Sequence, residues 1–131
     1  MASQEFTLFC QTVNDALSPD NSKLLSSQKT LTALRDKQPY KYVMFITQYL
    51  KNTSPYLTVD GKCFVATQLR RSLSESTVSQ TILAALDKNA ITELVKQLTA
   101  LFLDASMDAS VHKLVAYCVG EFGSSLLKHG L

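Results

Sequence analysis

Apolar residues recur at helical spacing in seven stretches of this chain, and short polar segments separate the stretches. The clearest stretch places its apolar side chains on one broad face of an α-helix: Val111, Leu114, Val115, Cys118, Val119, Phe122 and Leu126. No stretch shows the alternation of a strand, and only four glycines and three prolines interrupt the pattern. The sequence therefore predicts an all-α fold in which tight turns join the helices.

The stretches predict helices over about residues 3–17, 19–37, 41–51, 58–73, 78–86, 89–102 and 109–130. Because the connections are short, sequential helices should be antiparallel neighbours. The first and second, third and fourth, and sixth and seventh helices then form pairs that repeat about every 40 residues, as in HEAT or armadillo arrays. We expect an α-solenoid of about three HEAT-like antiparallel helix pairs, six or seven helices in all, with a closed helical bundle as the alternative.

This arrangement makes residues 1–131 a single segment with repeats over about 1–37 and 38–74, followed by an extra helix and a third repeat over 75–131. Ser18 and Pro19 form the strongest predicted helix start, with Ser18 as the N-cap of the second helix. Asn89 is the predicted cap of the sixth helix and Asp108 that of the seventh. Whether the fifth and sixth helices are separate stays open at this stage.

Composition and charge argue against several functional classes. The net charge is +2 and the basic residues are scattered, so a nucleic-acid partner is not expected. No apolar run approaches about 18 residues, so no membrane span is expected either. The three cysteines are far apart and odd in number, which predicts reduced, buried thiols in a cytosolic or nuclear protein.

The sequence shows no pattern that indicates catalysis. His112 and His129 lie seventeen residues apart without partners at metal-ligand spacing, so we expect no metal. Phosphate-binding loops, dinucleotide fingerprints and nucleophile elbows are also lacking in the sequence, and no cofactor or enzyme activity is expected. Stacked helix pairs expose an extended surface that suits protein recognition, and we therefore expect protein partners.

Three polar residues of the predicted fourth helix are candidates for partner binding: Gln68, Arg70 and Arg71. An arginine here could form charge-assisted hydrogen bonds to a partner carboxylate. The alternative is an intramolecular ion pair, or a solvated helix end in which a cation complements the helix dipole.

On the predicted seventh helix, Lys113, Tyr117 and Glu121 recur every four residues opposite the apolar face. This stripe is either a contact surface centred on an aromatic side chain or an ordinary polar face. Lys23, on the outward side of the second helix, is a further candidate with the same alternative.

Three segments resemble the N-terminal region of the importin-beta family of nuclear transport receptors: residues 16–21 (ALSPDN), 64–73 (FVATQLRRSL) and 111–121 (VHKLVAYCVGE). The resemblance places Arg70 and Arg71 at the basic pair of the family's second-repeat helix. It implies an α-solenoid whose first repeats help to bind the small GTPase Ran in its GTP form. Cargo and nucleoporins would use later repeats, so the chain would be the N-terminal part of a longer receptor found in cytoplasm and nucleus. The extra helix near residues 75–86 departs from the family pattern.

Two alternatives remain at the level of the sequence. The first is a generic HEAT-repeat scaffold or adaptor segment with another protein partner. The second is a self-contained helical bundle that dimerises through an exposed apolar end. A repeat array exposes apolar surface where a capping repeat is missing, which predicts weak self-association through the apolar face at the C-terminal end.

Overall fold

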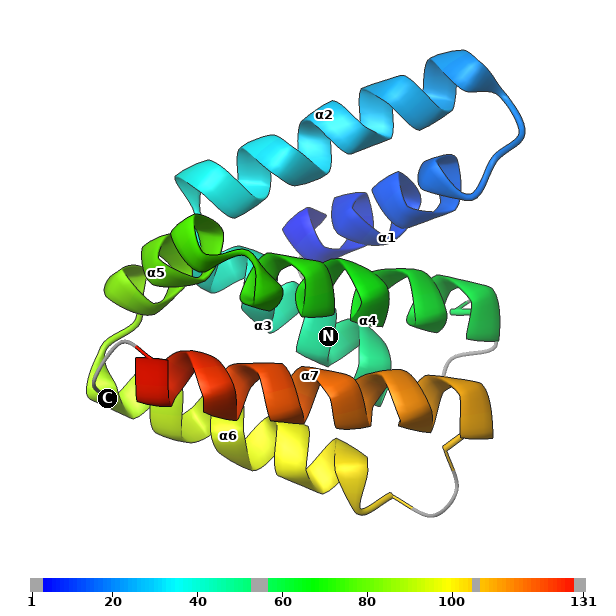
Figure 1. Ribbon diagram of the computed structural model, residues 1–131. Coiled ribbons are helices and arrows are strands. Elements are labelled where there is room, and N and C mark those ends of the chain that lie inside the picture. The colour runs from blue at the N-terminus through cyan, green and yellow to red at the C-terminus, as the bar shows by residue number, and fades with distance from the viewer. Residues whose placement is uncertain (1–3, 53–56, 105–106, 129–131) are drawn as a thin grey trace.

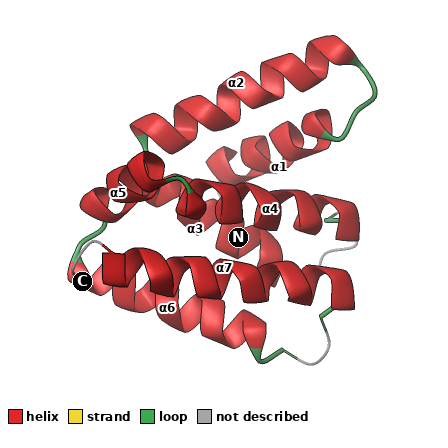
Figure 2. Cartoon of the chain, viewed as in Figure 1, coloured by secondary structure: helices red, strands yellow, loops and turns green. Residues whose placement is uncertain are grey.

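A computed structural model of the protein describes residues 4–52, 57–104 and 107–128. These residues form seven α-helices and no strand (Figures 1 and 2). The helices are α1 (Gln4–Ala16), α2 (Asn21–Lys37), α3 (Pro39–Lys51), α4 (Val59–Ser74), α5 (Ser76–Ala85), α6 (Lys88–Phe102) and α7 (Ala109–Lys128). The all-α prediction is confirmed. None of these helices is long and apolar enough to cross a membrane.

The helices stack in pairs, as Figure 1 shows. Helix α1 packs on α2, α3 on α4, and α6 on α7, which are the predicted pairs. Between pairs, α4 lies along α7 and α3 packs on α6, so the second and third pairs stack as neighbouring helical repeats do. Helix α2 instead packs on α1, α3 and α5. The arrangement is compatible with helical repeats, but these contacts do not by themselves establish a solenoid.

Helix α2 begins two residues later than predicted. Its N-cap is Asp20, whose carboxylate accepts hydrogen bonds from the backbone N–H groups of Ser22 at 2.9 Å and Lys23 at 3.4 Å. The prediction of Ser18 as the cap was wrong, because a charged acceptor is favoured at the positive end of a helix. The Ser18 hydroxyl instead accepts the N–H of Asp20 at 3.2 Å, within the turn before the helix.

Helices α5 and α6 are separate. Leu86 has an extended backbone that ends α5, and Asp87 caps α6 by accepting the N–H of Ala90 at 2.7 Å. Asp87 therefore replaces Asn89, the predicted cap. At the start of α7 the prediction is confirmed, since Asp108 accepts the N–H of Ser110 at 3.0 Å. The expected continuation of this helix beyond residue 128, with His129, lies outside the described residues.

One continuous core joins the helix pairs. It contains apolar side chains of all seven helices or their ends, among them Phe9, Leu31, Ile46, Leu69, Leu86, Leu98 and Val115. Aromatic rings of α1 and α3 meet in it, with the ring centroids of Phe9 and Phe45 5.5 Å apart. Cys118 is buried there as a free thiol, while Cys10 and Cys63 are free and partly buried. Of the three thiols predicted to be buried, only Cys118 is buried, whereas Cys10 and Cys63 are partly exposed.

Candidate functional site

Helix α4 presents polar side chains to two different neighbours. Successive residues of an α-helix point about 100° apart, so Arg70 and Arg71 cannot share one surface. Arg70 lies on the side of α7, where it contacts Tyr117. Arg71 and Gln68 lie on the side of α2, where they line a pocket. The adjacent arginines therefore belong to two separate candidate sites.

At the α4–α7 surface, Tyr117 lies between two cations. The guanidinium carbon of Arg70 is 4.2 Å from the centroid of the Tyr117 ring, and the Lys113 ammonium nitrogen is 6.0 Å from it. The tyrosine remains 40% exposed. Cation–π contacts of this kind contribute about 0.5–1 kcal/mol each at exposed positions, enough to favour one orientation of the ring. We call Arg70, Lys113 and Tyr117 the cation–tyrosine surface.

The residue after Tyr117 fixes α7 against α4. The thiol of Cys118 is buried and donates a hydrogen bond to the carbonyl oxygen of Ala66, with a sulfur–oxygen distance of 3.2 Å. Burial raises the pKa of this thiol to about 12, while the Arg70 charge lowers it and the Glu121 charge raises it. Glu121 therefore also lies near this contact, one turn beyond Tyr117. A neutral buried thiol is a structural group and not a nucleophile.

Arg70 and Arg71 were predicted to bind a partner, to form an ion pair within the chain or to lie at a solvated helix end. Among the described residues, neither Arg70 nor Arg71 forms an ion pair. The predicted intramolecular ion pair is thus not observed there. Instead, the Arg70 guanidinium lies over the Tyr117 ring, and its N–H groups form no ion pair among the described residues.

The second candidate site is a pocket between α2, α3 and α4 with a volume of about 230 Å³. Arginine and amide side chains from two helices line its walls. Gln28, Thr32 and Arg35 come from α2, and Gln68 and Arg71 come from α4. Tyr42 of α3 lies at the base of the pocket. We call it the α2–α4 pocket.

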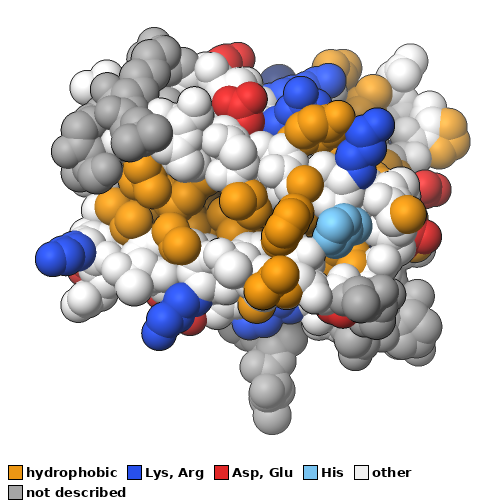
Figure 3. Space-filling view, turned by 60° about the horizontal axis from the view of Figure 1, so that its bottom comes forward, with side chains coloured by type: hydrophobic (Ala, Val, Ile, Leu, Met, Phe, Trp, Pro, Cys, Tyr) orange, Lys and Arg blue, Asp and Glu red, His pale blue; other side chains and the backbone are white. Residues whose placement is uncertain are grey.

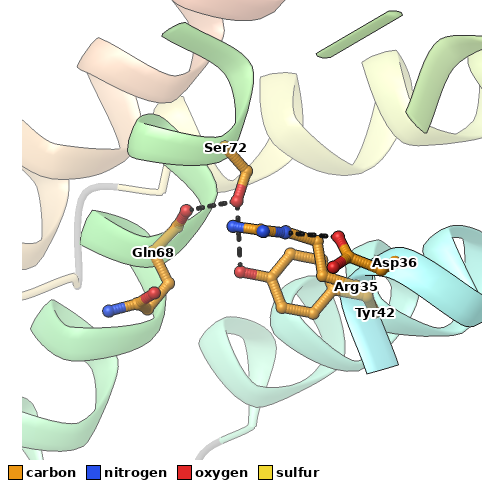
Figure 4. Close-up of polar contacts among 5 residues, drawn as sticks. All are labelled: Arg35, Asp36, Tyr42, Gln68 and Ser72. Atoms are coloured by element: carbon orange, nitrogen blue, oxygen red, sulfur yellow. Dashed lines mark hydrogen bonds and ion pairs between the residues drawn. The ribbon is translucent and has the colours of Figure 1, made fainter. Parts of the chain in front are cut away.

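Figure 4 shows the polar contacts among Arg35, Asp36, Tyr42, Gln68 and Ser72, most of which line this pocket. The Ser72 hydroxyl donates a hydrogen bond to the backbone carbonyl of Gln68 at 2.9 Å, and it lies 3.3 Å from the Tyr42 hydroxyl. Ser72 has one hydroxyl proton, so Tyr42 is the donor in the second contact. Burial has the largest effect on the pKa of Tyr42 and raises it, so the phenol is neutral. Both hydroxyl groups are satisfied within the fold.

Sequence reasoning found part of these sites. It predicted the stripe of Lys113, Tyr117 and Glu121, but the contact of Arg70 with that stripe depends on how α4 packs on α7. Lys23 is exposed at the start of α2, lines no part of the α2–α4 pocket and has no contact with Tyr117. The sequence analysis did not predict the polar stripe of α2. This stripe consists of Gln28, Thr32 and Arg35, which recur at helical spacing.

The face formed by α6 and α7 is apolar. Figure 3 shows hydrophobic side chains gathered in a band on this side of the molecule. Val95 and Phe102 of α6 are exposed, and Leu103 follows them at 72% exposure. His112 of α7 stacks on Phe102 with ring centroids 5.3 Å apart. The exposed apolar side chains therefore lie on α6 and just after it, whereas the described part of α7, where they were expected, exposes only Tyr117 among its large hydrophobic residues. Self-association through this face stays a prediction.

Comparison of the chain with family models, with curated proteins and with solved structures found no match.

Proposed function

We propose that this chain is a protein-binding helical module and that its partner docks on the cation–tyrosine surface. The observation that carries the proposal is the exposed ring of Tyr117 held beside the Arg70 guanidinium at 4.2 Å. Tyrosine and arginine are among the residue types that contribute most to binding energy at protein interfaces. A ring already oriented by cations loses less conformational entropy on binding than a free one does.

The charges of this surface favour an acidic partner. Arg70 and Lys113 are exposed cations, and the nearby Glu121 offsets one of the two charges. Opposite charge on a partner would speed association and fix the docking orientation. A carboxylate of the partner could accept the N–H groups at the edge of the Arg70 guanidinium while its neighbours pack on the Tyr117 ring.

We further propose that the module acts as a segment of a nuclear transport receptor that binds Ran in its GTP form and supports protein import. The resemblance to the importin-beta family supports this identity of the partner. Two of its three segments, residues 64–73 and 111–121, lie on α4 and α7, which carry the cation–tyrosine surface. The alternative is a helical scaffold segment that uses the same surface for another protein.

Binding to Ran in its two nucleotide states tests the proposed partner. Ran loaded with a non-hydrolysable GTP analogue or with GDP is immobilised at equal density, and binding of the purified chain is measured at equilibrium. We expect binding to the GTP form to be at least tenfold tighter. Equal affinity for both forms, or no binding to either by a chain whose circular dichroism shows folded helices, would exclude Ran as the partner.

A further inference from the structure

The α2–α4 pocket concentrates hydrogen-bond donors that the fold does not use. The side-chain amides of Gln28 and Gln68 and the hydroxyl of Thr32 have no hydrogen-bond partner in the described part of the chain. The same holds for the Arg71 guanidinium. These groups come from two helices and line one small space, so a ligand with several acceptor atoms could satisfy many of them together.

Arg35 adds a second guanidinium, which Asp36 helps to hold in place. The Asp36 carboxylate accepts the Nε–H of Arg35 at 3.1 Å. In Figure 4 the guanidinium extends from Asp36 toward the hydroxyl groups of Tyr42 and Ser72. The charge of Arg35 also lowers the pKa of Tyr42, against the larger effect of burial, which places that charge near the base of the pocket. Among the described residues, the terminal nitrogens of Arg35 have no hydrogen-bond partner.

The balance of charge in this region is positive. Arg35 and Arg71 both line the pocket, whereas Asp36 does not line it and compensates one of the two charges. Two guanidinium groups at one small pocket attract an anion to it. An anionic ligand would therefore compensate the excess positive charge and accept hydrogen bonds from the unused donors in one step.

The shape of the pocket selects among anions. A volume of about 230 Å³ is below the roughly 300–1,000 Å³ of pockets for cofactors and drug-sized ligands, and it admits a group of side-chain size. A planar carboxylate is satisfied by one arginine fork. A phosphate group is tetrahedral, carries a charge of about −1.5 to −2 at neutral pH and offers three strong acceptor oxygens. Donors that approach from two helices suit the phosphate better.

We propose that the α2–α4 pocket binds a phosphate group, held by Arg35 and Arg71 with support from Gln28, Thr32 and Gln68. The source of the phosphate is a phosphorylated side chain of a protein or free phosphate. This site does not depend on the proposed function, because it uses a different side of α4 from the one that contacts Tyr117 and a different ligand.

Nuclear magnetic resonance titrations of the full chain test the site with four probes: N-acetyl-phosphoserine amide, the same compound without phosphate, inorganic phosphate and acetate. We expect both phosphate probes to shift backbone amide signals of α2 and α4 around Arg35 and Arg71, with signals of α6 unchanged. Tighter binding of the phosphoserine probe than of inorganic phosphate would assign the site to a phosphorylated side chain, and equal binding would assign it to free phosphate.

Matched variants separate a built site from general attraction to a basic surface. Arg71→Gln and Arg35→Gln should each weaken phosphate binding at least tenfold. Lys29→Gln removes a positive charge from an exposed position of α2 that does not line the pocket, and it should weaken binding less than twofold. The proposal is overturned by equal losses in Arg71→Gln and Lys29→Gln, by acetate binding as tightly as phosphate, or by no shifts with either phosphate probe.

Discussion

The ring of Tyr49 in α3 lies directly against the Cα of Gly61 in α4. A Cβ atom at position 61 would lie 3.0 Å from the Tyr49 Cζ atom and closer still to the hydroxyl oxygen. Tyr49 is 0% exposed, so its ring cannot move into solvent, and burial raises the pKa of its hydroxyl to about 12. This hydroxyl has no hydrogen-bond partner in the described part of the chain. The contact between α3 and α4 therefore requires glycine at position 61.

We predict that Gly61→Ala lowers the free energy of unfolding by about 1–3 kcal/mol, because the added methyl group overpacks a closed contact. Tyr49→Phe should be neutral or stabilising, since it removes a buried hydroxyl without a partner. In the double variant the loss of the Tyr49 hydroxyl, the atom nearest to the added methyl group, should recover part of the lost stability. Urea denaturation of the four proteins measures this coupling, and strictly additive effects would contradict the proposed contact.

The buried Cys118 thiol should be protected from thiol reagents. With a pKa raised by burial to about 12, only roughly one thiol in ten thousand is ionised at pH 8, and the thiolate is the reactive form. Cys10 and Cys63 are partly exposed and should be modified first. Mass spectrometry after timed labelling, with and without denaturant, checks this order. Modification of Cys118 in the native protein as fast as that of Cys63 would contradict it.

Asp108 should make stability depend on pH at acidic values. Hydrogen bonds from the side chain and the backbone N–H of Ser110 lower the pKa of this carboxyl in the folded state. Its contribution to stability is therefore fully present above the pKa of the unfolded state, about 3.9, and is lost as pH falls through the folded-state pKa.

The variant Asp108→Asn keeps a capping acceptor but cannot titrate. We expect its free energy of unfolding to change less steeply with pH than that of the wild type below about pH 4. Thermal or urea unfolding measured between pH 2 and 6 gives the slope for each protein. This pH range brackets the reference pKa of aspartate, about 3.9. Identical slopes would contradict a lowered pKa of Asp108 in the folded state.

The apolar face of α6 and α7 should cause weak self-association that depends on concentration. Val95, 40% exposed on α6, is a suitable position for Val95→Lys, which should shift sedimentation toward the monomer. Leu25→Lys changes an exposed leucine of α2, away from this face, and serves as the matched control. A wild-type chain that stays monomeric at high concentration would rule out the association.

The helical architecture could be predicted because its signal is local. Apolar residues at a period of 3.6 define each helix face, and this period survives in Leu94, Leu98 and Leu101 of α6, all of which are buried. Helix starts were predicted less well, because several residues near each start can accept the same N–H groups. At both α2 and α6 a carboxylate forms the cap instead of the neighbouring hydroxyl or amide. Asp20 caps α2 and Asp87 caps α6.

The two candidate sites could not be predicted in full from the sequence, because they depend on how the helices pack in three dimensions. Lys113 and Tyr117 share one face of one helix, so spacing alone could place them together. The approach of Arg70 to Tyr117 depends on the register of α4 against α7, which no local pattern encodes. Gln28 gave a partial signal of the pocket in the sequence. It is a polar residue at a position of α2 where the helical period calls for an apolar, buried one. Only the tertiary structure, in which side chains of α2 and α4 line the same pocket, shows that Gln28 faces a polar pocket.

The affinity of the chain for Ran bound to a GTP analogue, measured for the wild type, Tyr117→Ala and Tyr40→Ala, tests the central claim most directly. Tyr40 is an exposed tyrosine of α3 outside the cation–tyrosine surface, and its replacement controls for loss of an exposed ring. We predict that Tyr117→Ala weakens binding at least tenfold, as expected for a hot-spot residue of an interface. The affinity of Tyr40→Ala should stay within twofold of that of the wild type. Equal affinities for all three folded proteins would contradict the assignment of this surface to partner binding.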